Sequence, residues 1–444
     1  MLFNSLEYLL FFISILGITW LVIGVPKLRL WILLIASYYF YTANNGWLIL
    51  LILISTQVDF YAARKIEVSR SLTERKALLT ISIVINLGIL GFFKYFNFFV
   101  SSVVSLANVI GWEMSWVDLN LVLPVGISFY TFQSMSYSID VYRGKCDPVH
   151  DFLPFAVFVS MFPQLVAGPI ERASSLLPQI LKKRENSAYI FAMGVDLFLR
   201  GLLLKLVVAN NVALISDRIF LLSSPSTTLL WIGSLAFGIQ IYCDFLGYTL
   251  MARGVGCSLG FRLSENFNSP YLSATPSEFW RRWHISLSTF VRDYLYIPLG
   301  GGTGTSLRQA VVLVATMALM GLWHGADWKF VIWGLYHGIM LVLYRNLGLG
   351  AGFHPKQSRY IFVGVWFILT LVGWMIFRCP DVFWLWDAVT TTTASSSRLK
   401  GVIFLTLMLG MYSAPLIYLK ITILLKTISL ITLILFNDIL SMYV

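Results

Sequence analysis

Long apolar runs recur along this chain and constrain its fold more than any other feature. Of its 444 residues, 58% are hydrophobic and only 12% are charged, whereas soluble domains carry roughly 25% charged residues. A bilayer-spanning helix needs about 20 mostly apolar residues, so the chain has room for on the order of ten to thirteen spans. Because backbone groups cannot stay unpaired in hydrocarbon, and because the runs do not alternate as barrel strands do, the spans should be helices. We therefore predict an all-α, polytopic membrane protein.

The basic residues gather in short loops between the apolar runs. The formal net charge is +11, and the clusters lie at Lys27 and Arg29, at residues 64–76 and at residues 182–184. An excess of Lys and Arg in short loops marks the cytoplasmic side of a membrane. The pattern therefore predicts cytoplasmic loops, an amino terminus on the outer side and no nucleic-acid partner. The four cysteines are dispersed, which indicates free thiols.

The positions of the apolar runs predict the spans one by one. The expected spans are residues 6–25, 30–41, 47–61, 77–93, 191–215, 229–246, 310–322, 330–343, 360–377, 402–419 and 421–435, with residues 96–110 as a further span or a shorter interfacial helix. Residues 121–126 and 161–169 are apolar but interrupted by Pro and Gly. Such backbone is tolerated at membrane depth only where protein buries it or a cavity supplies water. Broken helices lining a funnel and ordinary kinked spans both fit this pattern.

A less hydrophobic segment, residues 259–302, contains a helix start that the residues define well. Thr275, Pro276 and Glu278 fit a capping box, with Thr275 as the N-cap. We expect a continuous helix from there to Pro298, with His284 at the edge of its apolar face. The apolar face is formed by Trp280, Trp283, Leu287, Phe290, Val291 and Tyr294. Away from the centre of this face lie Arg281, Arg282 and Arg292.

Two of the five histidines stand out as candidates for chemistry. His324 lies in Gly-Leu-Trp-His-Gly at the end of an apolar run, and His284 lies among aromatic and basic residues. A histidine at membrane depth is costly and suggests a functional site. By contrast, His150 and His354 fall in polar loops, and His337 fits a packed helix position.

The chemistry that these residues support is proton transfer. No His-Glu-x-x-His, Gly-x-Ser-x-Gly or clustered Cys/His spacing is present, so we expect no metal ligands and no serine nucleophile. A neutral imidazole can take the proton of an acceptor hydroxyl as the hydroxyl attacks an acyl group. An acyl thioester would supply the leaving group. Asp327 could orient His324 if the two share a helical turn, although its position favours a cap of the next helix.

Several motifs, densest from residue 244 to 344, carry a family resemblance. They are Asp244 to Tyr248 (DFLGY), Gly260 to Arg262 (GFR), Glu265 to Tyr271 (ENFNSPY), residues 278–288, residues 292–301, Gly321 to Gly325 (GLWHG), and residues 163–169 with Gln164 and Gly168. With these motifs the chain resembles the membrane-bound O-acyltransferases, in particular their alginate O-acetyltransferase-like bacterial branch.

The resemblance implies a fold and a set of site residues. It implies about 11–13 transmembrane or re-entrant helices around a central funnel. We expect one membrane-embedded domain, 1–444, with N-terminal spans in 1–115, a catalytic core in 116–345 and C-terminal spans in 346–444. The family's invariant histidine corresponds to His324, and a second histidine of its bacterial members corresponds to His284. Residues expected to bind substrate or donor, or to support the site, are Trp323, Asp327, Glu278, Arg281, Arg282, Trp283, Arg292, Asp293, Asp244, Asn266 and Gln164.

The resemblance also implies an activity. Such enzymes take an acyl group from a cytoplasmic thioester, acetyl-CoA or an acyl carrier, without a tightly bound cofactor. They pass it to a hydroxyl of an exported polysaccharide, directly or through a periplasmic acetyltransferase partner. The location implied is the bacterial inner membrane, among its lipids. The arginines at 281, 282 and 292 could bind the donor phosphates or anionic lipid headgroups.

Alternatives remain open at this stage. A close relative transfers D-alanine to teichoic acids, although Tyr296 to Gly301 (YIPLGG) looks more like the alginate branch. The chain departs from the alginate pattern at Leu250, where an acidic residue is frequent, and it is shorter than typical members. Two alternative functions of a different class are a transporter and a non-catalytic scaffold. The absence of an internal repeat weakens the transporter reading.

Overall fold

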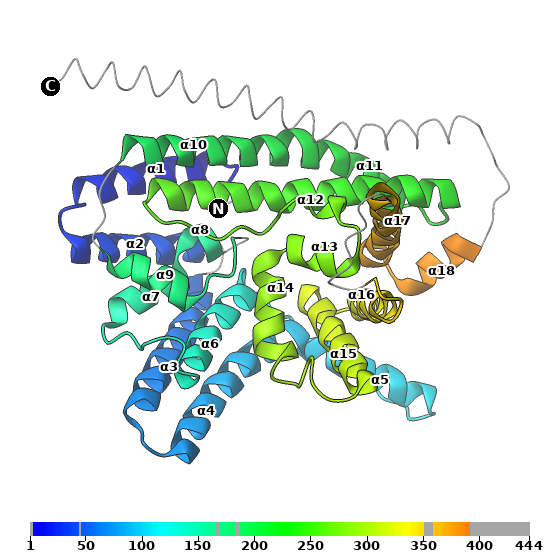
Figure 1. Ribbon diagram of the computed structural model, residues 1–444, viewed down its shortest axis with the longest axis horizontal. Coiled ribbons are helices and arrows are strands. Elements are labelled where there is room, and N and C mark those ends of the chain that lie inside the picture. The colour runs from blue at the N-terminus through cyan, green and yellow to red at the C-terminus, as the bar shows by residue number, and fades with distance from the viewer. Residues whose placement is uncertain (1–2, 44–45, 166–167, 183–186, 350–357, 391–444) are drawn as a thin grey trace. The chain divides into compact units, whose positions relative to one another are not determined.

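The computed structural model describes residues 3–43, 46–165, 168–182, 187–349 and 358–390, and every regular element within these ranges is helical (Figure 1). The all-α prediction is therefore confirmed for this part of the chain. The expected spans 402–419 and 421–435 and His354 lie outside the described residues. The chain divides into two compact units, Met1–Phe191 with Val255–Ser264, and Ala192–Gly254 with Glu265–Val444. The proposed boundaries of a single catalytic domain stay a prediction.

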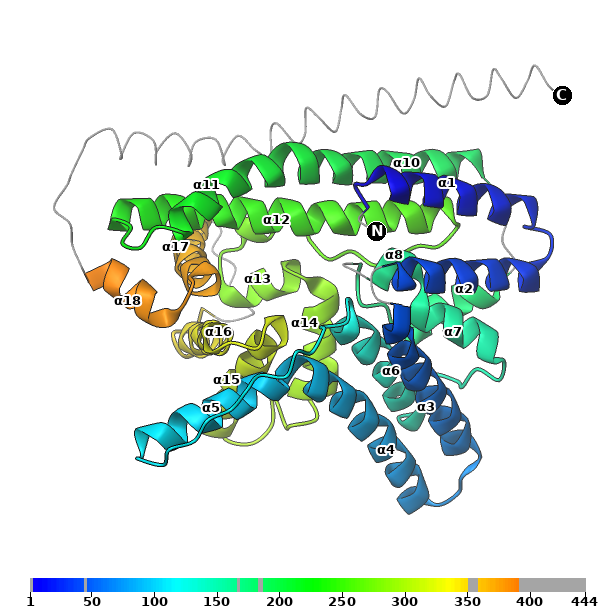
Figure 2. The ribbon, with the colours of Figure 1, turned by 180° about the vertical axis from the view of Figure 1, so that it is seen from behind.

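The first unit is built from helical hairpins. Its helices are α1 (Leu6–Leu21), α2 (Pro26–Thr42), η1 (Gly46–Leu48), α3 (Ile49–Val68), α4 (Leu72–Leu90), η2 (Gly91–Tyr95), α5 (Phe96–Val109), α6 (Ile127–Tyr142), α7 (Phe152–Ser160), α8 (Phe162–Leu165) and α9 (Ala173–Leu181). α1 and α2 form one hairpin and α3 and α4 another, and α6 packs against both α3 and α4 (Figures 1 and 2). Serine and aspartate side chains begin several of these helices: Ser5 caps α1, Ser71 caps α4 and Asp151 caps α7.

Three sequence predictions change in the first unit. The expected spans 77–93 and 96–110 form one apolar helix, Leu72–Val109, because the π-helical turn η2 continues it instead of breaking it. The basic loop expected at 64–76 shrinks to residues 69–71, since α3 extends to Val68 and Ser71 starts α4. Within the run 161–169 the helix is broken at Met161, because α7 ends before Met161 and α8 (Phe162–Leu165) starts after it.

The second unit holds the long helix α12 and a helical hairpin near the carboxyl end of the described chain. Its elements are α10 (Ala188–Leu203, which begins in the first unit), η3 (Leu204–Ala209), α11 (Asn210–Phe220), α12 (Thr227–Ser258, which ends in the first unit), η4 (Pro270–Leu272), α13 (Pro276–Arg282), α14 (Ile285–Val291), η5 (Arg292–Tyr296), α15 (Ser306–His324), α16 (Trp328–Asn346), α17 (Arg359–Arg378) and α18 (Val382–Thr390). α15 and α16 pack along each other, and α16 also packs on α17.

Glycine allows two helix pairs in the second unit to approach closely. A Cβ at Gly201 of α10 would lie 2.5 Å from the carbonyl oxygen of Gly247 on α12. In the α15–α16 hairpin, a Cβ at Gly321 would overlap the Phe330 carbonyl, and one at Gly334 would overlap the Met317 carbonyl. Small residues at helix contacts are typical of membrane proteins, because packing there depends on close backbone approach. The hairpin contact fixes the end of α15, where His324 lies.

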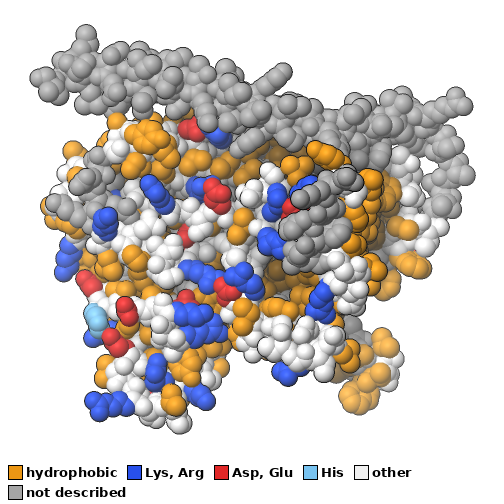
Figure 3. Space-filling model, in the orientation of Figure 1, with side chains coloured by type: hydrophobic (Ala, Val, Ile, Leu, Met, Phe, Trp, Pro, Cys, Tyr) orange, Lys and Arg blue, Asp and Glu red, His pale blue; other side chains and the backbone are white. Residues whose placement is uncertain are grey.

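Five described helices are long and apolar enough to cross a membrane: Gly46–Val68, Leu72–Val109, Thr227–Ser258, Ser306–His324 and Arg359–Arg378. Large hydrophobic side chains remain exposed along such helices, Leu87 and Ile368 among them. Figure 3 shows hydrophobic side chains over much of one face, with Lys and Arg side chains among them. The polytopic character is confirmed, whereas the span count of 11–13 and the central funnel stay predictions.

The α15–α16 contact predicts the effect of one methyl group. We expect Gly334→Ala to lower the stability of the detergent-solubilised protein by roughly 1–3 kcal/mol, because an added Cβ in a filled contact forces the backbones apart. The matched control is Gly364→Ala in α17, where a Cβ meets no atom within 4 Å. Thermal unfolding would measure both variants. An equal loss in the two would contradict the role of the hairpin contact.

Candidate functional site

The predicted helix from Pro276 to Pro298 is interrupted at the residue of greatest interest. α13 ends at Arg282 and α14 begins at Ile285, and His284 between them adopts φ 43° and ψ 55°. This left-handed conformation costs roughly 1–2 kcal/mol for a residue other than Gly. His284 therefore does not lie at the edge of an apolar helix face, as the periodicity predicted. It lies in a sharp turn and is 1% exposed.

Asn266 explains why the chain turns at His284. Its backbone oxygen accepts the N–H of Ile285 at 2.9 Å. Its side-chain oxygen accepts both the N–H of Ser286 at 3.3 Å and the Ser286 hydroxyl at 2.6 Å. Its amide donates to the Thr249 hydroxyl on α12 at 3.3 Å. A segment distant in sequence thus supplies the partners that α14's first turn needs, and a continuous helix would lose them.

The imidazole of His284 lies in an aromatic cage. Phe245 contacts it edge-on, with ring centroids 4.6 Å apart, and Trp323 contacts it at 5.9 Å. Neither ring nitrogen has a hydrogen-bond partner among the described residues, and both are buried. Burial in this cage lowers the pKa of His284, which lies outside the five apolar helices, and the neighbouring imidazole of His324 adds a smaller effect in the same direction. His284 is therefore neutral at pH 7.

His324 contacts the same indole. It is the last residue of α15, and its ring centroid is 4.9 Å from that of Trp323. Trp333 and Phe377 contact it edge-on at 5.1 and 5.3 Å. Unlike His284, His324 is only half-buried. The structure thus brings together His284, Trp323 and His324, three residues that the sequence singled out.

His337 and Trp283 belong to the aromatic core beside this site. The His337 ring stacks on Phe279 with an interplanar angle of 7°, and Trp333 lies 4.8 Å from it. Trp283 stacks on Phe279 with an interplanar angle of 13° and lies 5.0 Å from Trp374. The interpretation of His337 as a packed residue is confirmed, and Trp283 contributes to the same packing.

Glu278 organises an ion-pair cluster at the start of α13. The N-cap at Thr275 is confirmed, because its hydroxyl accepts the Glu278 N–H at 3.1 Å. The Glu278 carboxylate accepts the N–H of Ala274 at 2.8 Å, in place of the Thr275 N–H that a capping box would use. The same carboxylate pairs with Arg282 and with Arg359 of α17, each at 2.8 Å. Burial alone would raise the pKa of Glu278, but the Ala274 N–H and the two guanidinium groups together lower it.

The remaining predicted residues of the second unit form a helix cap or ion pairs, or are exposed. Asp327 caps α16 by accepting the Lys329 N–H at 2.9 Å, so it does not share a helical turn with His324 and the interpretation of Asp327 as a helix cap is confirmed. Asp244 pairs with Lys205. Arg292 pairs with Asp293 at 2.7 Å. The side chain of Arg281 is exposed.

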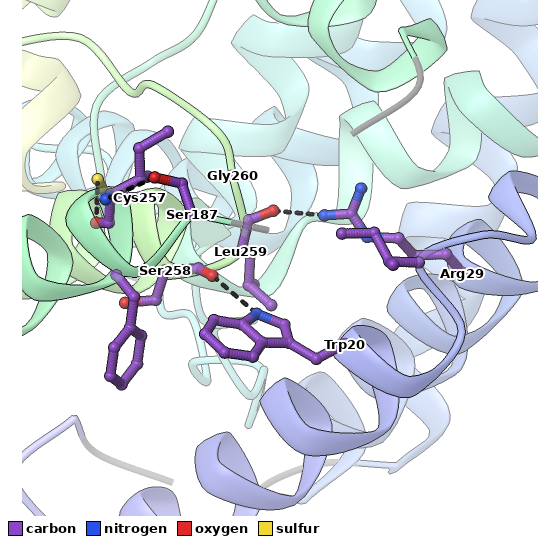
Figure 4. A pocket seen from close by; sticks show the side chains of 10 residues that line it. Trp20, Arg29, Ser187, Cys257, Ser258, Leu259 and Gly260 are labelled. Atoms are coloured by element: carbon purple, nitrogen blue, oxygen red, sulfur yellow. Dashed lines mark hydrogen bonds between the residues drawn. The ribbon is translucent and has the colours of Figure 1, made fainter. Parts of the chain in front are cut away.

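Gln164 lies in the first unit. Its amide donates to the Phe158 carbonyl at 2.7 Å, as does that of Gln133 at 2.6 Å. A small pocket also lies in the first unit (Figure 4). There the Trp20 indole donates to the Ser258 carbonyl at 3.4 Å, and Arg29 donates to the Leu259 carbonyl. None of the predicted site residues lines this pocket.

Sequence reasoning missed several residues that shape the site. Phe245, Trp333 and Phe377 supply the aromatic walls, and Arg359 completes the Glu278 cluster. Phe245 carried a signal, since it lies within the DFLGY motif. The others come from α16 and α17, and only the tertiary structure brings them to α13 and α15.

The chain is similar to known acyltransferases. A family profile described as MBOAT, membrane-bound O-acyltransferase family, matches residues 148–380. "Probable alginate O-acetylase AlgI" of Azotobacter vinelandii is 42% identical over 86% of this chain and 77% of its own length. "Peptidoglycan O-acetyltransferase" of Helicobacter pylori is 35% identical over 80% of this chain and 71% of its own length. "Teichoic acid D-alanyltransferase" of Bacillus subtilis is 30% identical over 51% of this chain and 60% of its own length.

The hydrogen bonds of Asn266 predict a graded loss of stability. We expect Asn266→Ala to destabilise the protein by roughly 1–3 kcal/mol, because buried groups at the start of α14 lose their partners. Thr249→Val removes only one of these bonds and should cost less. Thermal unfolding in detergent would compare the two. A larger effect of the threonine change would contradict the role assigned to Asn266.

The lowered pKa of His284 predicts a pH dependence of stability. The folded state holds this histidine neutral, whereas the unfolded chain protonates it below a pKa of about 6.5. Stability should therefore be fully present above that pH and fall as the pH is lowered, by at most about 1.4 kcal/mol per pH unit. His284→Asn removes the titrating group and keeps a residue that tolerates the left-handed conformation. Unfolding would be measured from pH 8 to pH 5. A stability that falls equally with pH in wild type and variant would contradict the lowered pKa of His284.

Proposed function

Because the chain belongs to the membrane-bound O-acyltransferase family, we propose that it moves an acetyl group from a cytoplasmic thioester to a hydroxyl of an exported polysaccharide. Family membership makes the protein a membrane acyltransferase. The choice of acetyl is supported by relatives named for acetyl transfer, at 42% and 35% identity over 86% and 80% of the chain. The relative named for D-alanyl transfer matches at 30% over 51%, and this acyl group is the second candidate.

The observation that carries the mechanism is the half-buried position of His324 at the end of α15, where it contacts the same indole as the buried His284. In the proposed step, an imidazole nitrogen of His324 takes the proton of the acceptor hydroxyl while the oxygen attacks the thioester carbonyl. The new C–O bond forms, the C–S bond breaks, and the proton passes from His324 to the departing thiolate. His324 ends α15, and the negative end of a helix dipole favours the positive charge that develops on the ring.

His284 takes a second role in this proposal. Its neutral ring contacts Trp323, and its two nitrogens have no partner within the described chain. Such a nitrogen can accept or donate one hydrogen bond to a reacting group that enters the cage. We assign to His284 the positioning of donor or acceptor, with Trp323 holding the two imidazoles in fixed orientation. Asn266 supports His284 through the turn.

The wider setting is proposed on the same basis. The donor is acetyl-CoA or an acyl-carrier thioester on the cytoplasmic side, and no cofactor stays bound between turnovers. The acceptor is a polysaccharide or other cell-envelope polymer, reached directly or through a periplasmic acetyltransferase. The location is the bacterial inner membrane. Of the proposed donor-binding arginines, Arg281 is exposed, whereas Arg282 is engaged by Glu278.

Removal of the proposed base should abolish acyl transfer. We expect His324→Ala to lower the transfer of label from acetyl-CoA by at least about 10²-fold, since general base catalysis typically contributes 10²–10⁴-fold. His284→Ala should lower it as well. Membranes that carry each variant at matched protein level would be assayed for label on outer-face polymer, with labelled D-alanyl carrier as a second donor.

His150→Ala is the matched control, because His150 lies in the first unit and its side chain is 66% exposed. It should leave transfer unchanged. Equal labelling by wild type and His324→Ala would contradict the mechanism and favour a non-catalytic scaffold. Transfer of D-alanine alone would replace acetyl as the acyl group.

A further inference from the structure

A carboxylate without a cationic partner lies inside the first unit. Asp59 of α3 is 0% exposed, and α3 lies within one of the apolar helices of membrane-spanning length. No Lys, Arg or His side chain pairs with it in the described part of the chain; its partners are all neutral. Burying a charge at membrane depth is expensive, and such residues generally mark a functional site. The catalytic proposal does not use Asp59.

The surroundings of Asp59 are unusually rich in oxygen atoms for a helix contact in a membrane protein. One carboxylate oxygen accepts from the hydroxyl of Ser82 on α4 and from that of Ser138 on α6, the latter at 2.8 Å. The other accepts from the amide of Asn86 at 2.9 Å. Three helices thus converge on one negative charge.

A second layer of polar groups continues the cluster. Ser55 donates to the side-chain oxygen of Asn86 at 2.6 Å and lies 2.8 Å from the hydroxyl of Ser134. Ser55, Ser82, Asn86, Ser134 and Ser138 are each at most 1% exposed. The polar side chains of this cluster contact one another in place of water or lipid. Neutralisation of Asp59 by a proton would require only one of these oxygen atoms.

The chemistry of these groups selects the kind of ligand. Carboxylate, hydroxyl and amide oxygens are the ligands of hard cations. The cluster supplies a single negative charge, and no group of three His, Cys, Asp or Glu side chains suited to a metal occurs among the described residues. One negative charge balances one monovalent cation, whereas a divalent ion would leave a net positive charge buried.

We propose that Asp59, together with the hydroxyl oxygens of Ser82 and Ser138, binds one Na⁺ ion between α3, α4 and α6, with Ser55, Asn86 and Ser134 as the polar layer that supports these ligands. The ion neutralises Asp59 and ties the three helices of the first unit together. It replaces hydrogen bonds from the serine hydroxyls, whose protons turn toward neighbouring acceptors. This site is separate from the acyl-transfer proposal and does not depend on it.

Binding of radioactive Na⁺ to the purified full chain in detergent tests the proposal. We expect wild type to retain one Na⁺ per chain and Asp59→Asn to retain none, because the variant keeps the shape of the side chain and removes the charge. Thermal unfolding in NaCl and in choline chloride at equal ionic strength gives a second measurement. Above the dissociation constant, each tenfold rise in Na⁺ should raise the folded-to-unfolded ratio of wild type about tenfold.

Asp118→Asn is the matched control, since it removes the same charge from an exposed position and should bind Na⁺ as wild type does. Ser138→Ala keeps the charge and should weaken Na⁺ binding severalfold, so it tests the site even if Asp59→Asn fails to fold. No bound Na⁺ in wild type, or equal binding by wild type and both site variants, would overturn the proposal. Stability that falls with rising pH in wild type but not in Asp59→Asn, without Na⁺ dependence, would identify a proton as the neutralising cation and also overturn it.

Discussion

The hydrogen bonds of Asn266 are the constraint on which the arrangement of the candidate site depends. They replace the continuation of one helix by a turn, and the turn places His284 among Phe245 and Trp323. The left-handed backbone at His284 persists because the surrounding bonds over-determine it, which is typical of functional sites. Without this turn, the periodicity of the segment would leave the imidazole on a helix surface.

Local sequence patterns predicted some of the helix ends at the candidate site. Thr275 and Glu278 form the expected cap, α15 ends at His324, and the two histidines of the motifs meet at one indole. These features depend on residues near each other in the chain or on motifs of a known family. The resemblance, now supported by the matched relatives, supplied the pairing of His284 with His324.

Features that depend on distant segments could not be predicted in the same way. Periodicity favoured a continuous helix through His284, because the competing bonds come from Asn266, which is remote in the sequence. The role of Glu278 depends on Arg359, which approaches from α17. The polar cluster around Asp59 was also invisible, since its serines and asparagine are scattered over three helices that otherwise read as apolar.

The two histidines differ in how far they can be reached from outside, and this difference has a consequence for inhibition. His284 is enclosed, whereas His324 is half-buried. An electrophilic inhibitor shaped like an acyl donor would therefore react with the imidazole of His324 in preference to that of His284. Selective covalent ligands for this protein should be designed against His324.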